Sequence, residues 1–173
     1  MKKFITATAF AILLSLTTFA QVPIKGTWNM SSKVPGATMS EDFIIDDNTQ
    51  GSAIMKMTIG LNLNIMGFKA VGTAVISISG DFTAEGDKML VKWDPESITS
   101  SRTPVTVTYK GEPDDDTKDF EDSLTEIIEE TEKEFKSWTE TEFYNLKVKG
   151  DTLYMTSKDE KGKASTDKLK RVN

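Results

Sequence analysis

Apolar and polar residues alternate so regularly from Ser52 to Ser79 that this stretch predicts a β-hairpin. Every second residue of its first arm is apolar: Ala53, Met55, Met57, Ile59, Leu61, Leu63 and Ile65. If Met66 and Gly67 form the tip, the residues opposite are Phe68, Ala70, Gly72, Ala74, Ile76 and Ile78, which are apolar or glycine. A shift of one residue would mix the apolar and polar faces. The pattern therefore predicts a long antiparallel ribbon with one apolar face.

Shorter segments on both sides show strand patterns bounded by proline and turn residues. The expected strands lie between Pro23 and Pro35, at 42–46, in a hairpin over 81–94, at 103–110, in a hairpin over 142–158, and at 163–172. Gly80 is expected to precede the second hairpin, and 94–97 to end its second strand. The second hairpin should place Met89, Val91 and Trp93 on its inward face.

The period changes after Asp114, where apolar residues recur at helical spacing: Phe120, Leu124, Ile127, Ile128, Phe135 and Trp138. This spacing predicts an amphipathic helix from about Thr117 to about Trp138, within an insertion spanning about 114–139. We expect its apolar face to pack on the remaining structure. A helix that binds a partner is the alternative.

Strands joined mainly by short turns indicate a mainly β protein with about 8–10 strands. Closing such a meander removes the exposed edges that a long ribbon would otherwise present. The expected fold is an antiparallel up-and-down β-barrel formed by residues 21–173 as one domain, with the helix inserted before the last three strands.

Two short motifs carry a resemblance to a family. Gly26-Thr27-Trp28 comes at the start of the first expected strand, and Lys170-Arg171-Val172-Asn173 ends the last one. In this pairing the chain resembles the lipocalins and the looser lipocalin-like proteins of Bacteroides-type bacteria. The resemblance implies that Trp28 closes the floor of the barrel and that Arg171 packs across it, a cation over an indole face. Trp28 as an ordinary core residue is the alternative.

The N-terminus predicts an exported protein. Lys2 and Lys3, the apolar run 9–16 and the small-x-small sequence 18–20 resemble a cleavable signal peptide over residues 1–20. No Cys follows the run, so a lipoprotein anchor is not expected. The expected location is therefore secreted or periplasmic.

Charge and composition exclude several classes of function. The net charge of −6 becomes −8 without the two lysines of residues 1–20, which disfavours nucleic acid as a partner. The chain has no Cys and no His, so Cys/His metal sites, disulfides and His-based catalytic pairs are absent. The strands lack the lipid-facing apolar band of an outer-membrane barrel, so no membrane span is expected.

No group of acidic residues predicts catalysis or a metal site. The acids at 114–116 lack the spacing of a calcium-binding loop, and Glu41, Asp42, Asp46 and Asp47 are interpreted as turn residues. We expect no enzyme activity, no metal and no cofactor.

The inward face supplies the candidate site. Its expected residues are Met55, Met57, Ile59, Leu61, Leu63, Ile76, Ile78, Phe82, Met89, Val91 and Trp93. They either line a cavity that binds a small hydrophobic molecule or fill the barrel completely. In the second case, the protein would act through its surface, with the acidic helix as a docking element for a protein or a glycan.

Overall fold

The computed structural model describes residues 21–114, 117–158 and 161–172, so the predicted signal peptide lies outside the described residues. Within these ranges the chain forms ten strands and one helix. In chain order they are β1 (Gly26–Val34), β2 (Ala37–Ile45), β3 (Gln50–Ile65), β4 (Phe68–Glu85), β5 (Lys88–Arg102), β6 (Thr106–Tyr109), β7 (Glu112–Pro113), α1 (Lys118–Ser137), β8 (Glu140–Lys149), β9 (Thr152–Lys158) and β10 (Ala164–Arg171).

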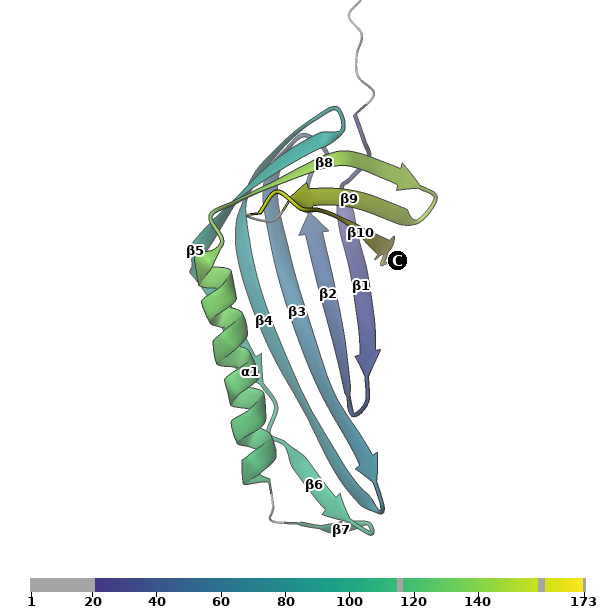
Figure 1. Ribbon diagram of the computed structural model, residues 1–173, viewed down its shortest axis with the longest axis vertical. Helices are drawn as coiled ribbons and strands as arrows, with labels where there is room; N and C mark the ends of the chain where they lie inside the picture. The colour runs from purple at the N-terminus through teal and green to yellow at the C-terminus, as the bar shows by residue number, and fades with distance from the viewer. Residues whose placement is uncertain (1–20, 115–116, 159–160, 173) are drawn as a thin grey trace, which may run out of the picture.

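Eight of the strands form a closed antiparallel barrel. Strands β1 to β5 follow one another, β8, β9 and β10 continue the ring, and β10 pairs with β1. The short strands β6 and β7 lie outside the ring on β4, and α1 follows them (Figure 1). The predicted fold class, an up-and-down barrel with one helix inserted before the last three strands, is confirmed.

The β3–β4 hairpin has the predicted register. Ile65 lies opposite Phe68, and the pairing continues without a shift to Gln50 opposite Thr83. Met66 and Gly67 at the tip have φ angles of 51° and 84°, the left-handed pair of a tight hairpin turn. The apolar residues of both arms therefore share one face of the ribbon.

Two expected strand ends are wrong. β4 continues through Gly80 to Glu85, because a glycine there lets the backbone of β5 pass close by at Lys92 and Trp93. β5 likewise continues through Pro95 to Arg102. Opposite Pro95 the β4–β5 register shifts between Ser77 and Ser79.

The side chain of Ser97 takes over ladder hydrogen bonds at this irregularity. Its Oγ accepts a hydrogen bond from the Ser79 N–H at 2.8 Å, and its one proton is shared between the carbonyls of Asp94 at 2.6 Å and Ser79 at 3.1 Å. A proline removes only one donor, so the strand can continue where a side chain compensates.

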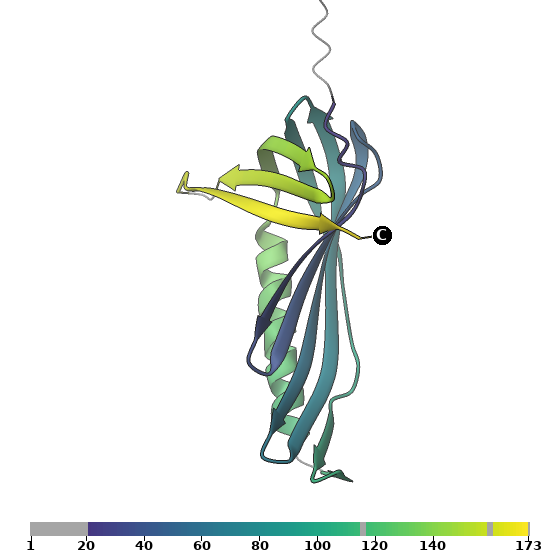
Figure 2. The same ribbon diagram turned by 90° about the vertical axis from the view of Figure 1, so that its right-hand side faces the viewer.

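The barrel closes at one end only. The β1–β10 seam contains two residue pairs, Trp28 with Arg171 and Asn29 with Lys170. Beyond this seam, β1 to β4 run on as an open sheet, with α1 along one side (Figure 1). Strands β8, β9 and β10 cross over the closed end, and their β9–β10 hairpin projects away from the sheet (Figure 2).

Arg171 and Trp28 hold the seam together. The guanidinium carbon of Arg171 lies 4.2 Å from the centre of the fully buried Trp28 ring. Arg171 also donates to the Lys25 carbonyl at 3.2 Å, and the Trp28 Nε1–H donates to the Ile24 carbonyl at 2.6 Å. These contacts tie the last strand to the segment that leads into the first.

Gly26 makes room for this arrangement. Its φ is 139°, a value that favours glycine, and a Cβ at this position would lie 3.0 Å from a guanidinium nitrogen of Arg171. The Gly-x-Trp sequence thus allows the arginine to approach the ring.

Helix α1 begins and ends one residue inside its predicted limits and packs on β4 and β5. Arg102 of β5 donates to Thr125 Oγ1 at 2.6 Å and to the Glu121 carbonyl at 3.2 Å. At the far end the rings of Phe68 and Phe120 lie 5.6 Å apart. The helix therefore forms a side wall of the open sheet, and its C-terminal end reaches the barrel opening (Figure 1).

The seam predicts strong coupling between Trp28→Ala and Arg171→Ala. Removal of the buried indole should lower the free energy of unfolding by about 3–5 kcal/mol. In a double-mutant cycle the two losses should be non-additive by at least about 1 kcal/mol, because each residue is the partner of the other. Urea denaturation followed by circular dichroism measures both quantities.

Lys168→Ala, an exposed cation on the same strand, is the matched control and should change stability by less than about 0.5 kcal/mol. Additive effects of Trp28→Ala and Arg171→Ala would contradict the role of this contact. If the alanine variants do not fold, Trp28→Phe combined with Arg171→Lys supplies the same cycle.

Candidate functional site

The inward-facing residues predicted as a site divide into two groups. One group is buried in the core, with each side chain at most 6 % exposed: Ile59, Ile76, Ile78, Phe82, Met89, Val91 and Trp93. Met55, Met57, Leu61 and Leu63 of β3 are only partly buried. Met55 lies level with the seam, opposite Phe43 and Ile78, and the other three lie beyond it. The closed end is therefore filled, and space for a ligand lies further along the strands.

A pocket of about 410 Å³ opens where the closed barrel gives way to the open sheet. We call it the mouth pocket. Its apolar lining is Met30, Met55, Trp93, Trp138, Phe143, Met155 and Leu169. Its polar lining is Glu41, Glu134, Thr141, Ser157 and Asp167. Seven strands and the end of α1 thus contribute to one site.

Two of the predicted residues, Met55 and Trp93, come together in the mouth pocket. The others do not line it. Ile59 and Leu61 instead line a small hollow of about 60 Å³ between β3 and α1, beside Phe120 and Leu124. Met57 and Leu63 pack against the core from the open part of β3.

Aromatic rings form a continuous cluster behind the pocket. Trp93 lies 5.5 Å from Trp138, and Trp138 lies 4.7 Å from Phe135, measured between ring centres. Phe43 joins Trp93 to Phe143 at 6.3 Å and 5.9 Å. Trp93 Nε1–H donates to Thr141 Oγ1 at 2.9 Å, which fixes the indole at the wall. Such tilted ring pairs make a rigid apolar surface.

Glu41 and Asp167 are the unexpected members of the site. Glu41 was predicted to be a turn residue, and this is wrong: β2 begins at Ala37, and Glu41 lies inside it, opposite Met30 and Met57. Asp167 of β10 lies opposite Met155. Each carboxylate is therefore at an inward position beside methionine, where water is partly excluded.

The electrostatics of these acids are unfavourable in the absence of a ligand. Burial raises the pKa of the Glu41 carboxyl, and the negative charges of Asp167 and Glu134 raise it further. Burial also raises the pKa of Asp167. Within the described ranges, none of the three carboxylates forms an ion pair or accepts a hydrogen bond.

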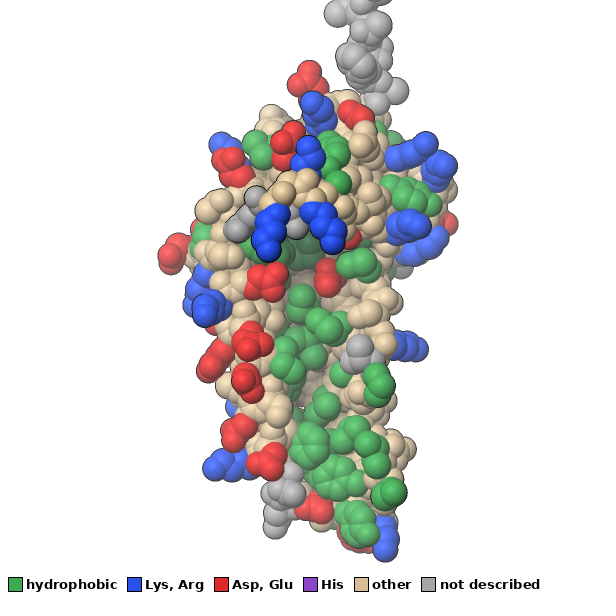
Figure 3. All heavy atoms as spheres, in the orientation of Figure 1, with side chains coloured by type: hydrophobic (Ala, Val, Ile, Leu, Met, Phe, Trp, Pro, Cys, Tyr) green, Lys and Arg blue, Asp and Glu red, His purple; other side chains and the backbone are tan. Residues whose placement is uncertain are grey.

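Figure 3 looks into this region. A hollow lies beneath the projecting β9–β10 hairpin, with acidic side chains at its lower rim and basic side chains on the hairpin above it. Hydrophobic side chains continue from the hollow along the open sheet, beside α1. The mouth pocket thus leads into a longer apolar surface.

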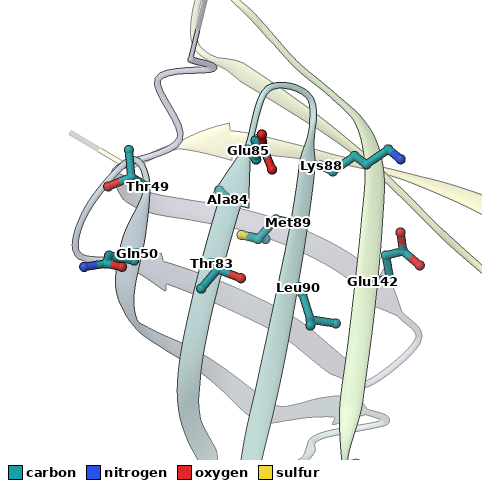
Figure 4. A pocket seen from close by; sticks show the side chains of 9 residues that line it. All are labelled: Thr49, Gln50, Thr83, Ala84, Glu85, Lys88, Met89, Leu90 and Glu142. Carbon is teal, nitrogen blue, oxygen red and sulfur yellow. The ribbon is translucent and has the colours of Figure 1, made fainter. Parts of the chain in front are cut away.

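A second hollow, of about 680 Å³, lies at the opposite end of the barrel between the β2–β3 turn, the β4–β5 hairpin and β8. Figure 4 shows its polar side chains spread apart: Thr49 and Gln50 on one side, Glu85 and Lys88 on the hairpin, and Glu142 across from them. It is larger but widely open to solvent, and its polar groups do not converge. We therefore take the mouth pocket as the candidate site.

The helix contributes through Trp138 and Glu134, which the predicted site did not include. Phe135 is 1 % exposed and Trp138 is half-buried, so they do not form an exposed apolar patch. The described part of the chain contains no group of three or more acidic residues placed to hold a metal ion. Its single helix is too polar to cross a membrane.

Comparison with protein-family models and with curated protein sequences finds no match to this chain.

Glu41→Gln should raise the free energy of unfolding at neutral pH. A carboxyl whose pKa is raised by folding stabilises the protein below its unfolded pKa, and this contribution is lost as the pH rises through the folded value. The amide carries no charge at any pH, so the gain should be present at about pH 7.5 and absent at about pH 3.5. Urea denaturation at the two pH values measures it.

Glu126→Gln, which removes an exposed carboxylate from α1, is the control and should show no such dependence. A Glu41→Gln variant that is equally destabilised at both pH values would show that the charge of this carboxylate does not destabilise the folded protein.

Proposed function

We propose that this protein is a noncatalytic, lipocalin-like binding protein that holds a small hydrophobic molecule in the mouth pocket. The observation that carries this proposal is the aromatic and methionine lining of a concave space of about 410 Å³ at the barrel opening. Ligand pockets of folded proteins have this size and this predominantly apolar lining, with a few convergent polar groups.

Methionine gives the wall adaptability. Met30, Met55 and Met155 come from three different strands and meet in the pocket. Their unbranched side chains can rearrange around ligands of different shapes, whereas the indoles of Trp93 and Trp138 provide fixed surfaces. This combination favours recognition of apolar bulk over recognition of one shape.

The open sheet offers room for a longer apolar tail. Beyond the pocket, Leu61 and Leu63 of β3 remain partly buried, and Ile127 of α1 is 41 % exposed. Ile65 and Met66 at the hairpin tip are 54 % and 94 % exposed. A chain-like ligand could place one end in the mouth pocket and continue over this surface (Figure 3).

The resemblance to lipocalin-like proteins supports the same function. The motif Gly26-Thr27-Trp28 and the contact between Trp28 and Arg171 are the features on which it rests. Export by the N-terminal segment, to the periplasm or the cell exterior, belongs to this proposal. Docking through the acidic helix is less favoured, because Phe135 and Trp138 are turned toward the barrel instead of outward.

A pocket-filling substitution tests the proposal. Ser157 lines the pocket and is partly buried, so Ser157→Trp should place an indole in the space meant for the ligand. We expect binding of the neutral apolar dye N-phenyl-1-naphthylamine, followed by its fluorescence, to weaken by at least about tenfold.

Ser31→Trp is the matched control, because Ser31 is exposed and alternates with the pocket residue Met30 along β1. Its affinity for the dye should stay within about twofold of the unsubstituted protein. Absence of dye binding to the unsubstituted protein, or equal loss in both variants, would contradict the proposal.

A further inference from the structure

We propose that the mouth pocket selects an amphiphile whose head is an organic ammonium group, held beside Glu41 and Asp167. This inference rests on the proposed function, because it assigns the chemical class of ligand for the same pocket. The apolar part of the ligand would lie against the methionines and indoles, and the cation would lie at the carboxylates.

The placement of the two acids is the first step. Along β2 the side chains of Glu41 and Phe43 share the inward face, and along β10 Asp167 and Leu169 do the same. These strands come from opposite ends of the chain, yet both place a carboxylate in one cavity. Glu134 of α1 adds a third negative charge at the exposed side.

The second step is that no positive charge in the described part of the protein neutralises these two carboxylates. No lysine or arginine lines the mouth pocket, and within the described residues neither Glu41 nor Asp167 has an ion-pair partner. An ionised carboxylate that is partly removed from water costs free energy unless a cation or a donor lies beside it. A bound ammonium group would supply that charge.

The aromatic lining favours an organic cation over a metal ion as the ligand. The described carboxylates are not gathered closely enough to form a metal site. Trp93 and Trp138 line the same pocket, and an indole attracts alkylammonium groups through its ring quadrupole. A site with both carboxylates and indoles is therefore better suited to an organic ammonium ion than to a metal ion.

The same lining disfavours an anionic amphiphile. A carboxylate, sulfate or phosphate head would meet three acids in the pocket and could reach only the basic side chains of the β9–β10 hairpin above it (Figure 3). Like charges in a partly desolvated site repel strongly. For three amphiphiles with the same tail, we therefore expect the cationic one to bind most tightly, the neutral one less tightly and the anionic one most weakly.

Three decyl compounds test this order with the full protein. Decyltrimethylammonium, decan-1-ol and decyl sulfate share one tail, and each displaces N-phenyl-1-naphthylamine below its micellar concentration. We expect the cation to bind at least about tenfold more tightly than the alcohol, and the sulfate more weakly than the alcohol.

Paired variants assign the preference to the named residues. Glu41→Gln with Asp167→Asn should weaken binding of decyltrimethylammonium by at least about tenfold and leave decan-1-ol within about twofold. Glu126→Gln, which removes one exposed charge outside the pocket, should leave both unchanged. Unaltered dye affinity of the double variant shows that its pocket is intact.

The outcomes separate this inference from the proposed function. Binding of the dye and of all three decyl compounds with equal affinity, or tightest binding of decyl sulfate, would overturn the ammonium assignment and leave the hydrophobic pocket standing. Equal loss of the cation and the alcohol in the double variant would also overturn it. Failure of the dye and of all three compounds to bind would instead overturn the proposed function.

Discussion

The seam between the first and last strands determines the shape of this protein. The guanidinium of Arg171 lies over the ring of Trp28, and only two residue pairs join β1 to β10. Because the closure is so short, the strands form a complete ring only around these residues. The rest of the long β3–β4 ribbon leaves the ring as an open sheet, against which α1 packs.

The mouth pocket follows from this partial closure. Near the seam, side chains from opposite walls meet and fill the interior, as the full burial of Phe43, Ile78 and Val91 shows. Where the walls separate, a space lined by Met55 and Trp93 remains. Trp138 at the end of α1 borders that space, so the inserted helix completes the site.

The acids of the pocket indicate a balance between stability and function. Apolar residues at Glu41 and Asp167 would extend the core, whereas the carboxylates have raised pKa values because they are partly buried near like charge. Residues that weaken the folded state without a compensating contact concentrate at functional sites. This reasoning links the electrostatics of the pocket to its proposed ligand.

The sequence predicted the elements better than the site. Strict alternation defines the register of β3 with β4, because a shift of one residue would expose the apolar face. The passage of β4 through Gly80 and of β5 through Pro95 could not be predicted, since it depends on a close backbone contact and on the Ser97 side chain. The sequence did contain a signal for the inward position of Glu41. It lies two residues before Phe43 and four before Ile45, so all three share one face of a strand that begins before residue 41.

The mouth pocket itself could not be predicted from local pattern. Its lining joins β1, β2, β3 and β5 to β8, β9, β10 and the end of α1, and the depth at which the barrel stops being filled depends on the length of the seam. The predicted inward face contained Met55 and Trp93 but not Trp138, Glu41 or Asp167, which lie on segments interpreted as helix, turn and closing strand.

Methionine methyl groups provide the most direct measurement of the central claim, that an apolar ligand binds at the mouth and not in the core or at the hairpin tip. In a protein labelled with carbon-13 at these methyls, titration with N-phenyl-1-naphthylamine should shift the signals of Met30, Met55 and Met155 through ring currents. Met89, buried in the core beside the second hollow, and Met66, exposed at the tip, should not move. Shifts confined to Met66 or Met89, or no shift at all, would contradict the account.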